Sequence, residues 1–114
     1  MYELQVALDL VVRENQTIRA FEKKYTHPQL QFTREIDIIT DLCAIECKCI
    51  TWHSIQRSNY IAAKLATQLT EQYELVRSGV VGVPHFMVYS KNAIPFDWKV
   101  WLFQKGILYA EGPA

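Results

Sequence analysis

The sequence predicts an α/β fold in which a mixed β-sheet is flanked by helices, and two observations carry this prediction. Residues 2–14 and 59–77 carry apolar side chains at helical spacing. Between and after them lie runs rich in β-branched and aromatic residues, bounded by turn residues, which is typical of strands. The element order is helix, three strands, helix, strand, short helix and short strand, which suits helices packed on a sheet.

Length and composition point to a single globular domain spanning residues 1–114. The chain has 114 residues, which is enough for one compact core and too few for two. It holds 12 Lys plus Arg and 12 Asp plus Glu, so the formal net charge is zero. That balance argues against strong non-specific attraction to nucleic acid, although a local basic patch remains compatible with it.

The chain has no apolar run approaching the roughly 20 residues that a membrane helix needs. Its first residues also lack the positive start and small-residue cleavage site of a signal peptide. We therefore expect a cytoplasmic protein with no membrane partner.

The first helix, residues 2–14, should face the core with Leu4, Leu8 and Val11, which recur at i, i+4 and i+7. Asn15-Gln16 interrupt the pattern. A strand over residues 17–25 follows, and then a loop from His27-Pro28 to about residue 33.

Residues 35–40 and 43–49 should pair as an antiparallel hairpin, because only a short polar break separates two β-prone runs. Alternation along a strand places Glu46 and Lys48 on one face. On the first strand, Asp37 should lie on the face opposite both Ile36 and Ile38.

Charged residues within two apolar strands need a physical explanation. A buried charge is costly unless it is paired or binds a metal. The simplest site that meets this need has Asp37 and Glu46 as metal ligands and Lys48 beside them. The alternative is an ordinary surface pair of Glu46 and Lys48 on a solvated face.

The three cysteines, Cys43, Cys47 and Cys49, crowd onto one strand face. Neighbours on one strand are poorly placed to form a disulfide. Together with His53 they have the wrong spacing for a standard zinc site. We interpret them as buried free cysteines that act as small hydrophobic residues.

Asp37 followed by Glu46-Cys47-Lys48 resembles the motif of the PD-(D/E)XK nuclease superfamily, which includes restriction endonucleases, Holliday-junction resolvases and many bacterial nuclease toxins. The resemblance implies a restriction-endonuclease-like core of order αβββαβ with a further short helix and strand. The proline that often precedes the Asp in this superfamily is replaced by Ile36.

The resemblance also implies a metal-dependent reaction. Mg²⁺ or Mn²⁺ would be held by Asp37, Glu46 and the main-chain carbonyl of Cys47, since hard cations prefer oxygen ligands. Such a metal polarises a phosphate and lowers the pKa of a bound water. Lys48 would orient that water or neutralise developing charge.

Two further positions are similar to those of the superfamily. Its members often carry a Glu on the first helix that completes the metal site, and Glu3 matches it better than Glu14. Glu3 is equally compatible with a simple helix N-terminal acid. Many members also point a Gln from the helix after the Glu-X-Lys strand into the site; Gln68 is the candidate and Gln72 the competitor.

The helix over residues 59–77 is the clearest in the sequence. Its apolar stripe is made of Ile61, Leu65, Leu69, Tyr73 and Val76. We expect an N-cap at Ser54 or Ser58 and an end at Gly79.

The C-terminal third should hold a strand within residues 80–90, a helix over residues 94–104 that ends at Gly106, and a strand over residues 107–109. Trp52 and His53 border the proposed site, where they would either contact nucleic acid or cap the core.

The function that these features favour is metal-dependent cleavage of nucleic acid, with DNA preferred over RNA as substrate on family frequency alone. Two alternatives remain: a nuclease toxin with an immunity partner, and an inactive nuclease-like binding or assembly subunit. We also expect a homodimer that uses the aromatic residues between 96 and 103, with Trp98 or Trp101 at the contact.

Overall fold

The computed structural model describes residues 2–55 and 59–112. The helices are α1 (Tyr2–Val12), α2 (Tyr60–Ser78) and α3 (Phe96–Lys105), with a 3₁₀ turn at Trp52–Ser54. The strands are β1 (Ile18–Thr26), β2 (Thr33–Thr40), β3 (Cys43–Lys48), β4 (His85–Ser90) and β5 (Leu108–Glu111). The predicted α/β class and element order are therefore confirmed.

The five strands form one mixed sheet in the order β1-β2-β3-β4-β5. β1, β2 and β3 pair antiparallel, because short turns connect them. β3, β4 and β5 pair parallel, since α2 and α3 carry the chain back across the sheet between them. The predicted antiparallel hairpin of β2 and β3 is confirmed, with Ile38 opposite Ile45 and Ile39 opposite Ala44.

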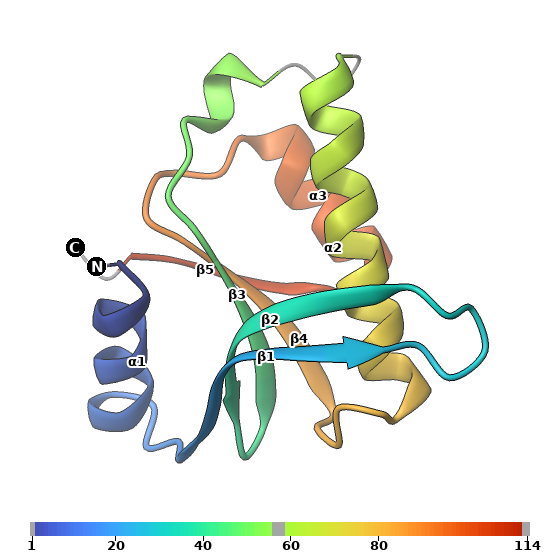
Figure 1. The fold of residues 1–114 in the computed structure, drawn as a ribbon. Helices are drawn as coiled ribbons and strands as arrows, with labels where there is room; N and C mark the ends of the chain where they lie inside the picture. Colours follow the sequence, from blue (N-terminus) through green and yellow to red (C-terminus); the bar gives the residue numbers. More distant parts are fainter. Residues whose placement is uncertain (1, 56–58, 113–114) are drawn as a thin grey trace.

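The sheet lies between α1 on one face and α2 with α3 on the other (Figure 1). The larger core, toward α2 and α3, includes Leu69, Val88 and Trp98. The smaller core, toward α1, includes Leu10 and Ile45. Each face of the sheet thus has its own apolar layer, which suits strands that are apolar on both sides.

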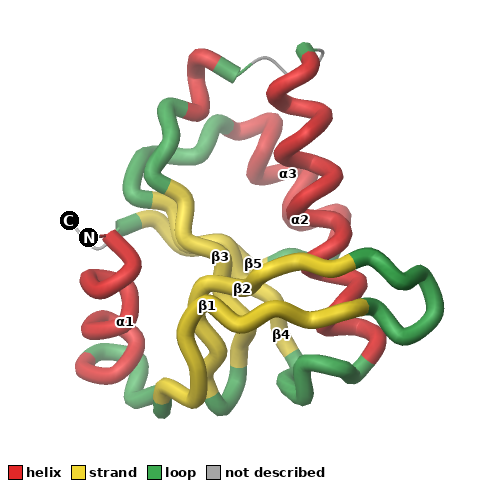
Figure 2. The backbone as a smooth tube through the Cα atoms, in the orientation of Figure 1, coloured by secondary structure: helices red, strands yellow, loops and turns green. Residues whose placement is uncertain are grey.

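β2 changes partners along its length. Its second half pairs with β3, whereas its first half pairs only with β1 in the described ladders. The β1–β2 hairpin then extends past α2 (Figure 2), where Arg34 Nε donates to Glu71 Oε1 over 2.7 Å. Across this change Ile36 joins the core under α2 and Ile38 joins the core under α1. The prediction that Ile36 and Ile38 share a face is therefore wrong, because β2 twists where it leaves β3.

The face of α1 that packs on the sheet differs from the predicted one. Leu4, Leu8 and Val11 are exposed, and the helix buries Tyr2, Val6, Ala7 and Leu10 instead. Both stripes are apolar, so periodicity alone does not choose between them. Polar contacts fix the rotation of the helix: the Tyr2 hydroxyl donates to the carbonyl of Gly112, and the Tyr89 hydroxyl donates to Asp9 Oδ2.

α2 begins at a different cap from the predicted ones. The side chain of Asn59 accepts the main-chain N–H of Ala62 at 2.9 Å, which makes Asn59 the N-cap. Ser54 closes the preceding 3₁₀ turn, and Ser58 lies outside the described residues. The predicted stop is confirmed, since Gly79 adopts a left-handed conformation with φ of 87°.

The buried stripe of α2 is also shifted. Ile61 is exposed and Tyr73 half-buried, while Leu75 and Gln72 are fully buried. The buried stripe is the part of α2 that contacts the sheet, and it includes the polar residue Gln72. A buried glutamine on this face requires polar partners beneath it.

The tryptophans are core residues. Trp52 is buried, packs edge-on against Trp98, and donates its indole N–H to Ser90 Oγ at 2.7 Å. Trp98 is wholly buried, so it cannot lie at a contact between subunits, and the dimer prediction is wrong for Trp98; Trp101, the other predicted contact residue, is half-buried. Phe96 and Phe103, both 80% exposed, are the aromatic residues that α3 presents to solvent.

None of the helices in the described parts of the chain has both the length and the apolar character that crossing a membrane requires.

Candidate functional site

Glu46 and Lys48 lie near the end of β3, on the face covered by α2. Alternation along the strand places both side chains on one face, as predicted, and the structure shows that α2 covers this face. Lys48 Nζ is 3.1 Å from Glu46 Oε2, and both side chains are largely buried. Because they are two residues apart on an extended strand, their long side chains can converge on one point above the sheet.

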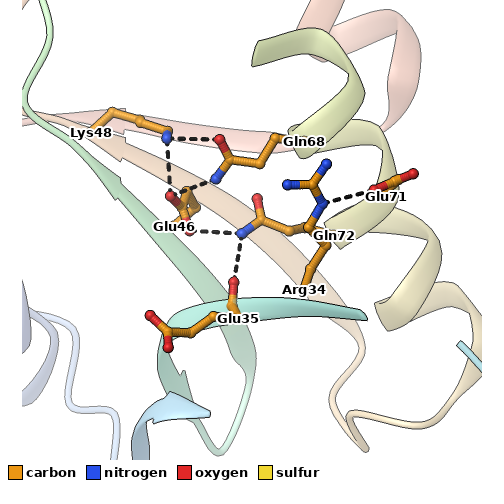
Figure 3. Close-up of polar contacts among 7 residues, drawn as sticks. All are labelled: Arg34, Glu35, Glu46, Lys48, Gln68, Glu71 and Gln72. Atoms are coloured by element: carbon orange, nitrogen blue, oxygen red, sulfur yellow. Dashed lines mark hydrogen bonds and ion pairs between the residues drawn. The ribbon is translucent and has the colours of Figure 1, made fainter. Parts of the chain in front are cut away.

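Gln68 of α2 completes a triangle with this ion pair (Figure 3). Its Nε2 donates to Glu46 Oε2 at 2.9 Å, and its Oε1 accepts from Lys48 Nζ at 3.1 Å. One amide thus satisfies a carboxylate and an ammonium at the same time. This arrangement fixes the orientation of Lys48 in a half-buried environment.

Gln72, one turn further along α2, holds the other oxygen of Glu46. Its Nε2 donates to Glu46 Oε1 at 2.8 Å and to the main-chain carbonyl of Glu35 at 2.9 Å. Gln72 is fully buried, and its Oε1 is a buried acceptor without a hydrogen-bond partner among the described residues. The two glutamines that the sequence left as alternatives therefore both contact Glu46.

Asp37 lies where β2 separates from β3. Its Oδ2 accepts the main-chain N–H of Cys47 at 2.9 Å. This side-chain acceptor takes the place of a main-chain carbonyl of β2, because the β2–β3 ladder has ended at this point. Burial and the nearby negative charge of Glu46 raise the pKa of Asp37 to about 6. The Cys47 N–H and the charge of Lys48 act in the opposite direction.

Glu3 reaches the same region from α1. Burial, followed by the charge of Asp37, raises the pKa of Glu3 to about 7. Glu14 lies beyond the C-terminal end of α1, near Tyr89, whose pKa is raised by burial first, then by Asp9, and then by the charge of Glu14. The structure therefore brings Glu3, and not Glu14, into electrostatic contact with Asp37.

Glu22 is a member of this acidic region that the sequence did not single out. It sits in β1 with a φ of 50°, and both its charge and a hydrogen bond to Glu3 raise the pKa of Glu3. The sequence offered one signal, an acidic residue between Phe21 and the two lysines Lys23 and Lys24.

The donor chemistry of this region fits a hard divalent cation. Asp37 and Glu46 are close enough for their charges to oppose each other, and Glu3 adds a third carboxylate in the field of Asp37. A cation would relieve this repulsion, and oxygen donors are those that Mg²⁺ and Mn²⁺ prefer.

The side chains do not form a ready-made cage. Within the described ranges, no three or more His, Cys, Asp or Glu side chains converge on one metal position. Both oxygens of Glu46 are engaged by Lys48, Gln68 and Gln72. Cation binding would therefore exchange at least one of these contacts for a metal–oxygen bond.

The cysteines are free, and they do not belong to this cluster of polar side chains on the α2 face. Cys43 is buried and Cys47 half-buried, and both belong to the core beneath α1. Cys49 follows the end of β3 and is exposed, so the prediction of a buried cysteine is wrong there. Burial raises the pKa of Cys47, and the charges of Asp37 and Glu3 add to this shift, so its thiol stays protonated.

No protein-family model matches the chain, and a search of curated proteins finds no similar sequence.

Proposed function

We propose that this protein is a metal-dependent nuclease of the PD-(D/E)XK type, with a restriction-endonuclease-like core. The observation that carries the proposal is the contact of Glu46 with Lys48 and Gln68, beside Asp37 at the point where β2 and β3 separate. An acidic pair next to an oriented ammonium is the arrangement that phosphodiester hydrolysis needs.

The cation would be held by Asp37 and Glu46, with Glu3 and the Cys47 carbonyl as further candidates. When bound, it supplies charge neutralisation on the phosphate and makes a water more acidic. The residues of the chain do the rest. Lys48, fixed by Gln68, holds its ammonium within reach of a phosphate oxygen or the attacking water.

Gln72 contributes a positioning role. It ties the Glu46 carboxylate to the main chain at Glu35, so β2, β3 and α2 hold Glu46 together. A carboxylate held from two sides loses little rotational freedom when it binds a ligand, which lowers the cost of assembling the site.

DNA is the proposed substrate, with RNA as the alternative. Two other roles share the same fold: a nuclease toxin bound by an immunity protein, and an inactive nuclease-like subunit. The ion pair and both glutamine contacts of Glu46 favour an enzyme over the inactive subunit, because a relic site has no need to orient a buried lysine.

The test is incubation of purified protein with supercoiled plasmid, linear DNA and tRNA, each with Mg²⁺, with Mn²⁺ and with chelator. We expect cleavage of at least one substrate that needs the metal and is lost in Glu46→Gln. Glu14→Gln, which removes an exposed carboxylate after α1, is the matched control and should cleave like wild type. Equal cleavage by wild type and Glu46→Gln would show that the activity does not arise from this site.

A further inference from the structure

A cleft of about 620 Å³ lies beside the candidate site, between the end of β3 and the N-terminal half of α2. Lys48 and Gln68, which both contact Glu46, line it. The cleft therefore opens directly next to the Glu46 carboxylate. Its volume is in the range of sites that accommodate small organic molecules.

The charged residues that line the cleft are all cationic. Arg34, Lys48 and Lys64 contribute to its wall, and no carboxylate is found among the lining residues that the structure describes. Two of these cations have acidic partners that are not lining residues: Glu71 pairs with Arg34, and Glu46 pairs with Lys48. In a chain with no net charge, the cations on this wall favour an anionic ligand, with Lys64 adding a charge to the two that are ion-paired.

The rest of the wall is apolar and aromatic. Ile50 and Leu65 form part of it, and Tyr60 and Ile61 stand at its rim with 75% and 59% exposure. Lys64 Nζ lies 5.5 Å from the centroid of the Tyr60 ring, so the cation and the ring are neighbours on α2. The ligand that suits such a wall has a flat apolar ring joined to an anionic group.

An unpaired nucleotide meets both requirements, and a paired one does not. In a duplex the bases are stacked and present only their edges, in a major groove about 12 Å wide. Single-stranded nucleic acid instead offers base faces for stacking on aromatic side chains, with its phosphates along a basic groove.

We propose that this cleft binds one unpaired nucleotide of a single strand, with its base against Tyr60 and Ile61 and its phosphate toward Lys48 and Lys64. The substrate class is then single-stranded nucleic acid or an unpaired segment of a longer molecule. This inference rests on the proposed function in one respect, because it treats the phosphate near Lys48 as the one that is cleaved.

Binding can be measured separately from cleavage. Fluorescence anisotropy with labelled oligothymidine and oligouridine of about ten nucleotides, and with a duplex of equal length, is recorded in chelator so that no metal-dependent cleavage occurs. We expect wild type to bind a single strand at least about tenfold more tightly than the duplex. A third probe, oligodeoxyuridine, has the base of oligouridine and the sugar of oligothymidine, so its ratio to oligouridine identifies the preferred sugar.

Two variants test the cleft. Tyr60→Ala should weaken single-strand binding by about tenfold, since a base loses its stacking surface. Lys64→Ala should weaken it by a similar factor and reduce its salt dependence by about one phosphate contact. Both residues are exposed, so the fold should survive, and a thermal melt checks this.

The chain offers a matched control on α3. Lys105 Nζ lies 5.6 Å from the centroid of the Trp101 ring, a pair similar to Lys64 and Tyr60 but outside the cleft. Lys105→Ala and Phe103→Ala should bind like wild type. If they weaken binding as much as Lys64→Ala and Tyr60→Ala do, the cleft is not the binding site.

The remaining outcomes separate this inference from the nuclease proposal. Three outcomes overturn the inference: duplex binding as tight as single-strand binding, no binding at all, or unchanged binding by both cleft variants. None of them bears on the nuclease proposal, which the cleavage assay tests. Single-strand binding that depends on Tyr60 and Lys64, with no cleavage under any metal, supports the cleft and removes the nuclease proposal.

Discussion

Asp37 and Cys47 are joined by a hydrogen bond in which the Cys47 N–H donates to Asp37 Oδ2 over 2.9 Å. This bond lies where the ladder between β2 and β3 ends. It holds the carboxylate beside Glu46, where burial, and then the repulsion between the two carboxylates, raises the pKa of Asp37 to about 6. The site thus stores unfavourable electrostatic energy that a cation would release.

Asp37→Asn should therefore stabilise the protein at pH 8. The folded state holds the Asp37 proton up to about pH 6, whereas the unfolded chain releases it near the ordinary value of 3.8. Between these values stability falls as the pH rises, and above about 6 the full penalty is present. After discounting for water at this half-buried position we expect about 1 kcal/mol, or about 4 °C in Tm. Asparagine retains an oxygen that can accept the Cys47 N–H.

Thermal melts at pH 8 and pH 4 check this prediction. The gain in Tm should be present at pH 8 and shrink toward zero at pH 4, where Asp37 of wild type is largely protonated. Glu3→Gln should show the same sign, since the pKa of Glu3 is raised to about 7. A variant Asp37→Asn that is less stable than wild type at pH 8 would contradict the prediction.

Divalent cations should bind wild type and raise its Tm. We expect Mg²⁺, Mn²⁺ and Ca²⁺ all to bind, because Asp37 and Glu46 offer hard oxygen donors, and only Mg²⁺ and Mn²⁺ to support cleavage. Calorimetry on wild type, Asp37→Asn and Glu14→Gln measures the site directly. Binding by Glu14→Gln but not by Asp37→Asn is the expected pattern, and equal binding by both would contradict it.

The sequence predicted the element order and the hairpin because strong local signals determine them. The β-branched run at residues 35–40, the short turn before residues 43–49, and the glycines that end α2 and α3 specify strands and stops without tertiary information. The rotation of α1 was mispredicted because Leu4 and Leu8 compete with Val6 and Leu10. Only the contacts of the helix with Gly112 and Tyr89, far along the chain, decide between the two faces.

The candidate site was predicted in part for a similar reason. The strand alternation of Glu46 and Lys48 is a local rule, and it holds. Glu22 was missed because its position depends on a left-handed residue within a strand, which no periodicity indicates. Gln68 and Gln72 were alternatives because helical spacing does not show how far each side chain reaches. In the structure each glutamine donates to a different oxygen of Glu46.

The two glutamines should have separable effects. Gln72 is fully buried, and Gln72→Leu would leave Glu46 Oε1 and the Glu35 carbonyl without this donor. We expect a loss of about 2 kcal/mol in the free energy of unfolding. Gln68 is half-buried, and Gln68→Ala should change stability by less than about 1 kcal/mol but reduce cleavage strongly, because Lys48 loses its positioning contact.

Urea unfolding and cleavage rates of both variants measure this difference. Thr67→Ala, on an exposed neighbouring position of α2, serves as the control for stability. The assignment fails if Gln68→Ala cleaves like wild type, or if Gln72→Leu is as stable as wild type.

The last prediction concerns the oligomeric state. α3 exposes Phe96, Val100 and Phe103 at i, i+4 and i+7, so one face of a short helix is apolar and open to solvent. Asp97 lies in the first turn of α3 and Lys105 in its last. In a two-fold dimer with the two α3 helices antiparallel, opposite charges would meet at both ends of the apolar stripe. We therefore expect a homodimer through this face, in place of one through Trp98.

Light scattering at micromolar concentration should give twice the chain mass of 13.3 kDa, and Phe103→Glu should return the monomer. Trp98→Glu is unsuitable as a test, because a charge at a wholly buried position should unfold the protein. The exposed apolar face of α1 is the rival contact, and Leu8→Glu tests it, since Leu8 is 65% exposed. A dimer lost in Leu8→Glu but retained in Phe103→Glu would move the interface to α1. A wild-type mass of one chain would end the proposal, and the aromatic stripe of α3 would then need another partner.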